Sequence, residues 1–356
     1  MNTSMVVSIQ YLRGLAAMMV VYHHSVRKVL EMNPDSVIPY SGFGNAGVDI
    51  FFVISGFIMW VTTISKTQTP AYFWYRRIIR IVPLYWFFIL VIIIPKLLVP
   101  DIFQSVQLEP SHILKSLLFI PHYHPAVSDQ IWPILIPGWT LNYEMFFYLL
   151  FGASLFIAPR WRLAALASTF LLLVAMGQWM TGNNPLFITY TDKLLLEFLA
   201  GIIIGIFYIR GVALKPMISF IVMGVAIILL IGFEMSLLPS ETRIISWGIP
   251  ATLMVIAALS MDKAGKIPPI NSLKVIGDAS YSIYLSHILS IEVVEFLWEI
   301  TAWQTDTLAT QLLFVAVCIG ISTLVGIAAF YRVEQPMLKG LRSLEPISYR
   351  GKHFDQ

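Results

Sequence analysis

Long apolar runs separated by short polar connections extend along most of the chain. A helix that crosses a bilayer needs about 20 mostly apolar residues. The stretches that meet this condition, the sixth of them short, cover residues 8–26, 44–64, 80–99, 138–157, 161–180, 194–209, 216–233, 244–261, 280–298 and 312–331. The pattern predicts an all-α, polytopic membrane protein with about ten transmembrane helices.

Two segments depart from this pattern. Residues 112–121 are apolar but too short to span, which predicts an interfacial or re-entrant piece within the loop 96–137. The end of the chain is short and polar. We therefore expect one transmembrane domain over residues 1–340 and a short cytoplasmic tail over residues 341–356.

Composition agrees with a membrane protein. Hydrophobic residues make up 58% of the 356 residues and charged residues 12%, whereas about 25% of a soluble domain is charged. The net charge of +3 is small and scattered, which argues against a nucleic-acid-binding surface. A single cysteine, Cys318, excludes a disulfide framework within the chain. The first apolar run lacks the flanks of a cleaved signal peptide, so we expect it to remain as a helix.

The positive charges alternate between the two sides of the predicted topology. If the N-terminus is cytoplasmic, the inner segments hold 16 lysines and arginines and the outer loops hold 6. Cytoplasmic loops are enriched in these residues. The distribution therefore predicts that both termini are cytoplasmic.

The first predicted helix carries two polar residues on one face. Arg13 and His24 are eleven residues apart, which places them within about 20° of each other and about 16 Å apart along the axis. Ionisable residues within spans are costly and are candidates for function. Arg13 would lie deep in the membrane and His24 near the outer end; the alternatives are a structural cation and a solvated histidine.

Two acidic residues are expected at a depth similar to that of His24. Asp49 lies near the outer start of the second predicted helix, and Glu144 lies about 9 Å below the start of the fourth. A carboxylate beside an imidazole orients the ring and stabilises its protonated form. We therefore expect His24, Asp49 and Glu144 to form a catalytic site, although either acid could serve only in packing or at a helix start.

The inner side carries a second polar group. Arg77 and Arg80 are three residues apart and share a helix face at the cytoplasmic end of the third predicted helix. With Arg13 they suit an anionic phosphate group from the cytosol, although such arginines also serve as topology anchors. His287, about 10 Å into the ninth helix, is expected to line a substrate channel or to be a core histidine.

The remaining histidines do not predict a metal site. His112, His122 and His124 are irregularly spaced in the outer loop, and no carboxylate accompanies them in the pattern that metal sites show. We expect no metal and no bound cofactor.

Several short segments recur along the chain in a definite order: Arg13 with His24, the run 47–57, Arg77 with Arg80, Trp139–Leu141 with Glu144, the run 281–287 and the run 332–336. Together they resemble the acyltransferase-3 family of membrane acyltransferases, over nearly the whole chain. Each segment alone is weakly specific, but their order and topology are jointly specific. The chain is most similar to the exopolysaccharide-production (ExoZ-like) O-acetyltransferases.

This resemblance implies transfer of an acyl group, commonly acetyl from acetyl-CoA, to a sugar hydroxyl. The implied partners are acyl-CoA, a carbohydrate acceptor, the lipid bilayer and polysaccharide-assembly proteins, and the implied location is the bacterial inner membrane. His24 would act as general base or carry the acyl group itself. The alternatives are a transporter or flippase for a glycan intermediate, and a non-catalytic export scaffold.

Overall fold

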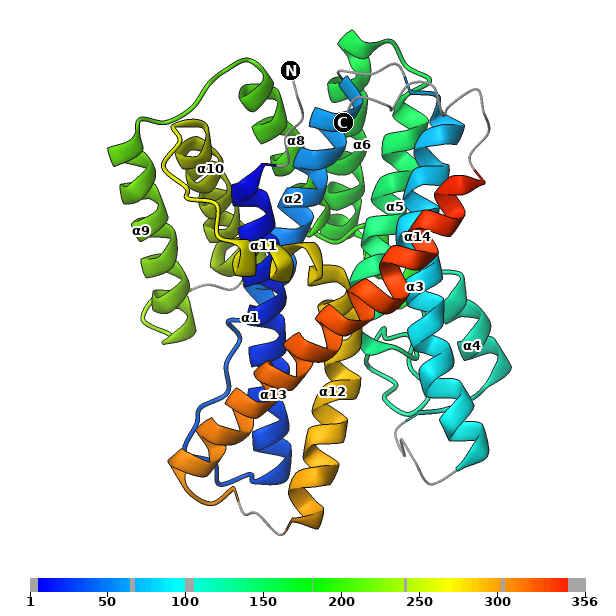
Figure 1. Ribbon diagram of the computed structural model, residues 1–356. Helices are drawn as coiled ribbons and strands as arrows, with labels where there is room; N and C mark the ends of the chain where they lie inside the picture. The colour runs from blue at the N-terminus through cyan, green and yellow to red at the C-terminus, as the bar shows by residue number, and fades with distance from the viewer. Residues whose placement is uncertain are drawn as a thin grey trace. The chain divides into compact units, whose positions relative to one another are not determined.

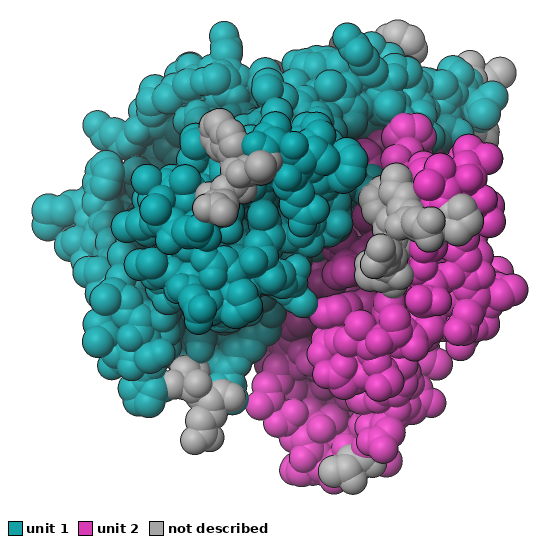
Figure 2. Space-filling view, turned by 90° about the horizontal axis from the view of Figure 1, so that it is seen from below, with its two compact units in different colours: residues 1–54, 207–356 teal, residues 55–206 magenta. Residues whose placement is uncertain are grey.

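The computed structural model describes residues 6–64, 68–99, 106–180, 182–239, 242–301 and 305–344 (Figure 1). The chain folds into two compact units, which Figure 2 shows in different colours. Unit 1 combines residues 1–54 with residues 207–356, and unit 2 consists of residues 55–206. Each unit is described separately below.

Unit 1 is built from helices of the two ends of the chain. Its short helix α11 precedes α12 directly, and π-helical turns lie before α10 and after α13. The helices are α1 (Val7–Met32), the first part of α2 (Asn45–Ile64), the end of α8 (Leu195–Ile209), α9 (Pro216–Glu234), η2 (Ile244–Gly248), α10 (Ile249–Lys263), α11 (Asn271–Asp278), α12 (Ser280–Ile300), α13 (Leu308–Ala329), η3 (Phe330–Glu334) and α14 (Gln335–Ser343).

Unit 2 holds the middle of the chain. The helices are the remainder of α2, then α3 (Pro70–Leu98), α4 (Pro110–Leu117), η1 (Ile136–Gly138), α5 (Trp139–Ser154), α6 (Pro159–Trp179), α7 (Pro185–Tyr190) and most of α8. The helix α3 begins ten residues before the predicted span, because Thr69 caps its first turn and Pro70 suits the first helical position.

The structure confirms the helical class, and the described residues form no strand beyond one isolated bridge. Each of the predicted apolar stretches is helical, and among the described residues six helices are long and apolar enough to cross a membrane. The number of about ten spans and the cytoplasmic placement of the termini stay predictions. Part of the predicted segment 112–121 forms α4, and residues 345–356 of the predicted tail lie outside the described residues.

The helix α1 lies against several helices of unit 1, because small residues allow close approach on more than one side. Its neighbours include α10, α11, α12 and α13. Where α11 passes α1, the backbone of Gly277 lies directly against the carbonyl oxygen of Gln10, and Gly14 faces Gly277 from α1. At the start of α2, Gly44 and Gly47 approach the α1 backbone in the same way. Such contacts between small residues are typical of membrane helix packing.

An apolar cluster joins α1, α12 and α13. Figure 1 shows these three helices, in blue, gold and orange, in the lower part of the view. Val29 of α1, Trp298 of α12 and Phe314 of α13 are buried in the cluster, and the single cysteine, Cys318, is buried with them. The close packing fixes the register between α1 and α12, which carry the histidines described below.

We expect Gly277→Ala to destabilise the protein by about 1–3 kcal/mol, because the added Cβ would overlap the Gln10 carbonyl and force α11 away from α1. Thermal unfolding of the purified protein in detergent measures the effect. The matched control is Gly320→Ala on α13, where a Cβ meets no atom within 4 Å and the substitution should preserve stability. Equal unfolding temperatures for the two variants would contradict the proposed constraint.

Candidate functional site

The imidazole of His24 lies beside another imidazole, that of His287. His24 comes from α1 and His287 from α12, and their ring centroids are 5.0 Å apart. His23 also touches the ring of His24 edge to face, at 5.1 Å, and binds the backbone carbonyl of Ser41 through its Nδ1. The sequence analysis placed His24 and His287 in separate roles, and the structure brings them together in one site.

Backbone contacts fix the tautomer of His287. This side chain is fully buried, and its Nδ1 lies 2.6 Å from the carbonyl oxygen of Tyr284. A carbonyl only accepts, so Nδ1 must carry the proton and donate it. The Nε2 atom then keeps its lone pair, and it has no hydrogen-bond partner among the described residues. His287 therefore offers a proton acceptor next to His24.

Asp49 does not orient His24 in the way that the sequence analysis expected. Its carboxylate is fully buried and forms an ion pair with Arg243, with a Nη2–Oδ2 distance of 2.6 Å. Arg243 also donates to the side chain and the carbonyl of Asn45. The expectation rested on a similar predicted depth of Asp49 and His24, whereas Arg243 lies 194 residues from Asp49 in the sequence. The ion pair compensates the buried charge and holds the start of α2 against the segment before η2.

Glu144 belongs to unit 2 and has hydroxyl partners there. The Tyr148 hydroxyl donates to Oε1 of Glu144, and Ser55 Oγ donates to the same oxygen at 3.3 Å. Tyr148 lies one turn after Glu144 on α5, so the i, i+4 spacing was a signal for this contact. The guanidinium of Arg77 lies 5.9 Å from the centroid of the Tyr148 ring. Tyr148 thus contacts both the Glu144 carboxylate and the Arg77 guanidinium, which the sequence analysis assigned to opposite sides of the membrane.

The remaining predicted cations are distributed over both units. Arg13 belongs to unit 1, where its Nη1 donates to the Gln10 side chain at 3.4 Å. Arg77 and Arg80 belong to unit 2 and lie on the same face of α3, both partly buried. Arg77 also lies over the ring of Phe73, at 5.8 Å from its centroid. Within unit 2 these two cations share a helix face, as the sequence predicted.

Three loop histidines also come together. His112 of α4 lies 2.7 Å from His122 between Nδ1 and Nε2, and its ring centroid is 5.0 Å from that of His124. Burial and the two neighbouring rings lower the pKa of His112 from 6.5 to about 4. In the described part of the chain, no group of three or more histidine, cysteine or acidic residues has an arrangement that could hold a metal ion.

Removal of the partner of Asp49 should destabilise unit 1. We expect Arg243→Gln to lower the free energy of unfolding by about 3 kcal/mol. This is the lower end for a buried pair, because the Arg243 side chain is 30% exposed. Adding Asp49→Asn to this variant removes the unpaired charge and should restore more than half of the loss. The control is Arg27→Gln in an exposed pair with Glu31, which should change stability little. A double variant as unstable as the single one would contradict a charge-pair role.

The histidine cluster of α4 should make stability depend on pH. The folded state keeps His112 neutral, whereas the unfolded chain binds a proton near pH 6.5, so protonation favours unfolding. The contribution of His112 to the free energy of unfolding is fully present above about pH 6.5 and is lost as the pH falls towards about 4. Thermal unfolding across this window should show a shallower pH dependence for His112→Gln than for the wild type. Identical slopes would rule out His112 as a source of the dependence.

Comparison with known proteins adds to this geometry. Residues 6–332 match the acyltransferase domain that defines the acyltransferase-3 family. The chain is 39% identical over 301 residues to the exopolysaccharide production protein ExoZ of Rhizobium meliloti, a match that covers 83% of this chain and 90% of that protein. No solved structure matches the chain significantly.

More distant relatives are longer than this chain. The peptidoglycan O-acetyltransferase OatA of Listeria monocytogenes is 27% identical over 83% of this chain and 50% of its own length. The O-acetyltransferase OatA of Staphylococcus aureus is 28% identical over 68% of this chain and 45% of its own length. The match therefore spans about half the length of these two relatives. The domain match, with the apolar helices of the structure, shows that the chain is an integral membrane acyltransferase of the acyltransferase-3 family.

Proposed function

We propose that the protein is an O-acyltransferase that moves an acyl group, acetyl in the simplest case, from acyl-CoA to a hydroxyl of a cell-surface polysaccharide or its lipid-linked precursor. The names of the relatives support this proposal, because they refer to exopolysaccharide production and to O-acetylation. The proposed location is the bacterial cytoplasmic membrane, with both termini in the cytosol. No relative named above supports the alternative of a glycan transporter without transferase activity.

The contact between His24 and His287 is the observation that carries the proposal. A sugar hydroxyl is a weak nucleophile and must lose its proton as it attacks a thioester. Two adjacent imidazoles, one with its Nε2 lone pair held available by the Tyr284 carbonyl, can accept that proton. We assign His24 as the general base and His287, whose ring lies against that of His24, as the residue that positions His24.

The reaction is then balanced in atoms and protons. The hydroxyl oxygen attacks the acyl carbonyl carbon as His24 takes the hydroxyl proton. The tetrahedral intermediate collapses, the carbon–sulfur bond breaks, and the CoA thiolate leaves and takes up the proton from His24. In the second version of this mechanism, a ring nitrogen of His24 attacks the acyl carbonyl carbon, the carbon–sulfur bond breaks, and the CoA thiolate leaves with the proton of the imidazole. The sugar hydroxyl then attacks the acyl-imidazole, the carbon–nitrogen bond breaks, and the released imidazole takes up the hydroxyl proton.

The donor needs cations for its phosphates. Arg13, Arg77 and Arg80 are the proposed phosphate-binding residues, because guanidinium groups bind phosphate through two parallel hydrogen bonds. In this assignment Glu144 and its partner Tyr148 hold Arg77 in place from within unit 2. Asp49 supports the site indirectly, through the ion pair that fixes the start of α2. Polysaccharide-assembly proteins are the proposed protein partners.

The test measures transfer of labelled acetyl from acetyl-CoA to extracted surface glycan by purified protein in nanodiscs. We expect His24→Ala to reduce the rate about 100- to 10,000-fold, as for loss of a general base. His287→Ala should also reduce it, and Arg77→Gln should raise the KM for acetyl-CoA. His124→Gln, a histidine variant in the α4 loop, is the control and should retain activity.

Two results would contradict the proposal. The first is the absence of label transfer by folded wild-type protein across a panel of surface glycans. The second is full activity in His24→Ala and His287→Ala. Thermal unfolding of each variant beside the wild type separates lost chemistry from lost folding.

A further inference from the structure

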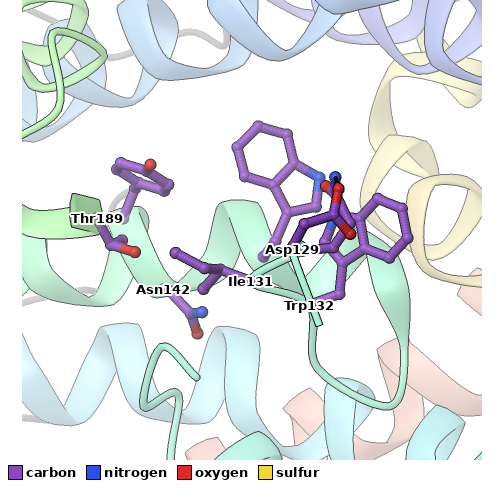
Figure 3. A pocket seen from close by; sticks show the side chains of 8 residues that line it. Asp129, Ile131, Trp132, Asn142 and Thr189 are labelled. Carbon is purple, nitrogen blue, oxygen red and sulfur yellow. Dashed lines mark hydrogen bonds between the residues drawn. The ribbon is translucent and has the colours of Figure 1, made fainter. Parts of the chain in front are cut away.

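A cavity of about 320 Å³ lies at the start of α5 in unit 2. It is formed by the segment 129–132, the first turn of α5 and Thr189 of α7. Figure 3 shows Asp129 and Trp132 towards one end and Asn142 and Thr189 towards the other. The volume is at the lower end of that of small-molecule sites, which begin at about 300 Å³.

Two buried polar side chains line this cavity without a partner. Asn142 is 4% exposed and Thr189 is 3% exposed. Among the described residues, neither the amide of Asn142 nor the hydroxyl of Thr189 makes a side-chain hydrogen bond, and neither is among the fully enclosed polar atoms, so both groups open onto the cavity. Polar groups that open onto a cavity and have no partner in the protein are available to hydrogen-bond a ligand.

The aromatic residues of the cavity suit the apolar face of a sugar ring. Trp132 and Trp139 are both partly exposed at the cavity, and Trp139 packs edge to face on Tyr143 at 5.9 Å. A pyranose presents C–H groups on its faces and hydroxyl groups around its edge. Aromatic rings bind the former, while amide and hydroxyl groups bind the latter. Tryptophans at this depth would also fit an interfacial belt, but a belt does not require buried amides beside them.

The charge of the lining selects against the acyl donor. The eight residues that line the cavity include one carboxylate, Asp129, and neither lysine nor arginine. Asp129 accepts a hydrogen bond from the Gln130 side chain at 3.0 Å. An acidic rim repels the phosphates of acyl-CoA, whereas a carboxylate and an amide are good acceptors for hydroxyl groups. The ligand that fits is uncharged and rich in hydroxyl groups.

We propose that this cavity binds one sugar unit of the carbohydrate acceptor, with Trp132 and Trp139 against the ring and Asn142 and Thr189 bonded to its hydroxyls. The assignment of the sugar as acceptor rests on the proposed O-acyltransferase function. The site belongs to the same helix as Glu144, since α5 carries Asn142 in its first turn and Glu144 two residues later.

The sharpest variants are isosteric. Asn142→Leu and Thr189→Val keep the volume of the side chains and remove their hydrogen bonds. Because these groups have no partner in the free protein, both variants should unfold at the same temperature as the wild type or higher. Both should raise the KM for glycan about tenfold and leave the KM for acetyl-CoA unchanged. Trp132→Ala should raise the glycan KM further, while Trp179→Ala on the exposed end of α6 is the matched control.

Direct binding distinguishes failure of the site from failure of the proposed function. Saturation-transfer NMR on protein in nanodiscs would use the methyl glycosides of glucose, galactose and N-acetylglucosamine as probes. Binding by the wild type that is lost in Asn142→Leu supports a sugar site even if no acetyl transfer is found. Transfer with an unchanged glycan KM in Asn142→Leu and Trp132→Ala overturns the site and leaves the proposed function intact. Loss of stability in Asn142→Leu also overturns it, because the amide would then have a structural role.

Discussion

Close backbone contact around α1 is the constraint on which the arrangement of unit 1 depends. Lipid tails are as apolar as the side chains that they surround, so the hydrophobic effect does not drive helices together within a bilayer. Helices there associate mainly through tight van der Waals packing. Gly277 of α11 and Gly47 of α2 allow these two helices to reach the α1 backbone. This packing sets the position of α1 relative to α12. It thereby fixes the contact between His24 and His287 that the proposed chemistry requires.

Several buried polar groups near the candidate site have a particular partner, although Asp49 Oδ1 has none among the described residues. Asp49 forms an ion pair with Arg243, and Glu144 accepts hydrogen bonds from Tyr148 and Ser55. The Tyr284 carbonyl accepts a hydrogen bond from Nδ1 of His287. Such groups are unfavourable in an apolar environment unless they are paired. The Nε2 atom of His287 is enclosed without a partner among the described residues, and the Asn142 amide opens onto the cavity of unit 2. The two proposals assign His287 to positioning the general base and Asn142 to sugar binding.

The helices could be predicted from the sequence because long apolar runs have few alternatives in a membrane. The short helix α11 was not predicted, since eight residues with mixed polarity give no spanning signal. The partners of polar residues were harder to predict. Arg243 lies in a connection between two predicted helices, yet it pairs with Asp49. The contact of His24 with His287 likewise joins residues far apart in the sequence. The contact between Glu144 and Tyr148 had a local signal, in its spacing of four residues.

The burial of Cys318 has a practical consequence for mapping the orientation of the chain. It is the single cysteine, and it is enclosed by α1, α12 and α13. A buried thiol in apolar surroundings is inert towards a polar maleimide. The wild-type chain therefore serves as an unlabelled background without a cysteine-free parent. A cysteine introduced into any connection between helices would report, by its reaction with an impermeant reagent, which face of the bilayer that connection occupies.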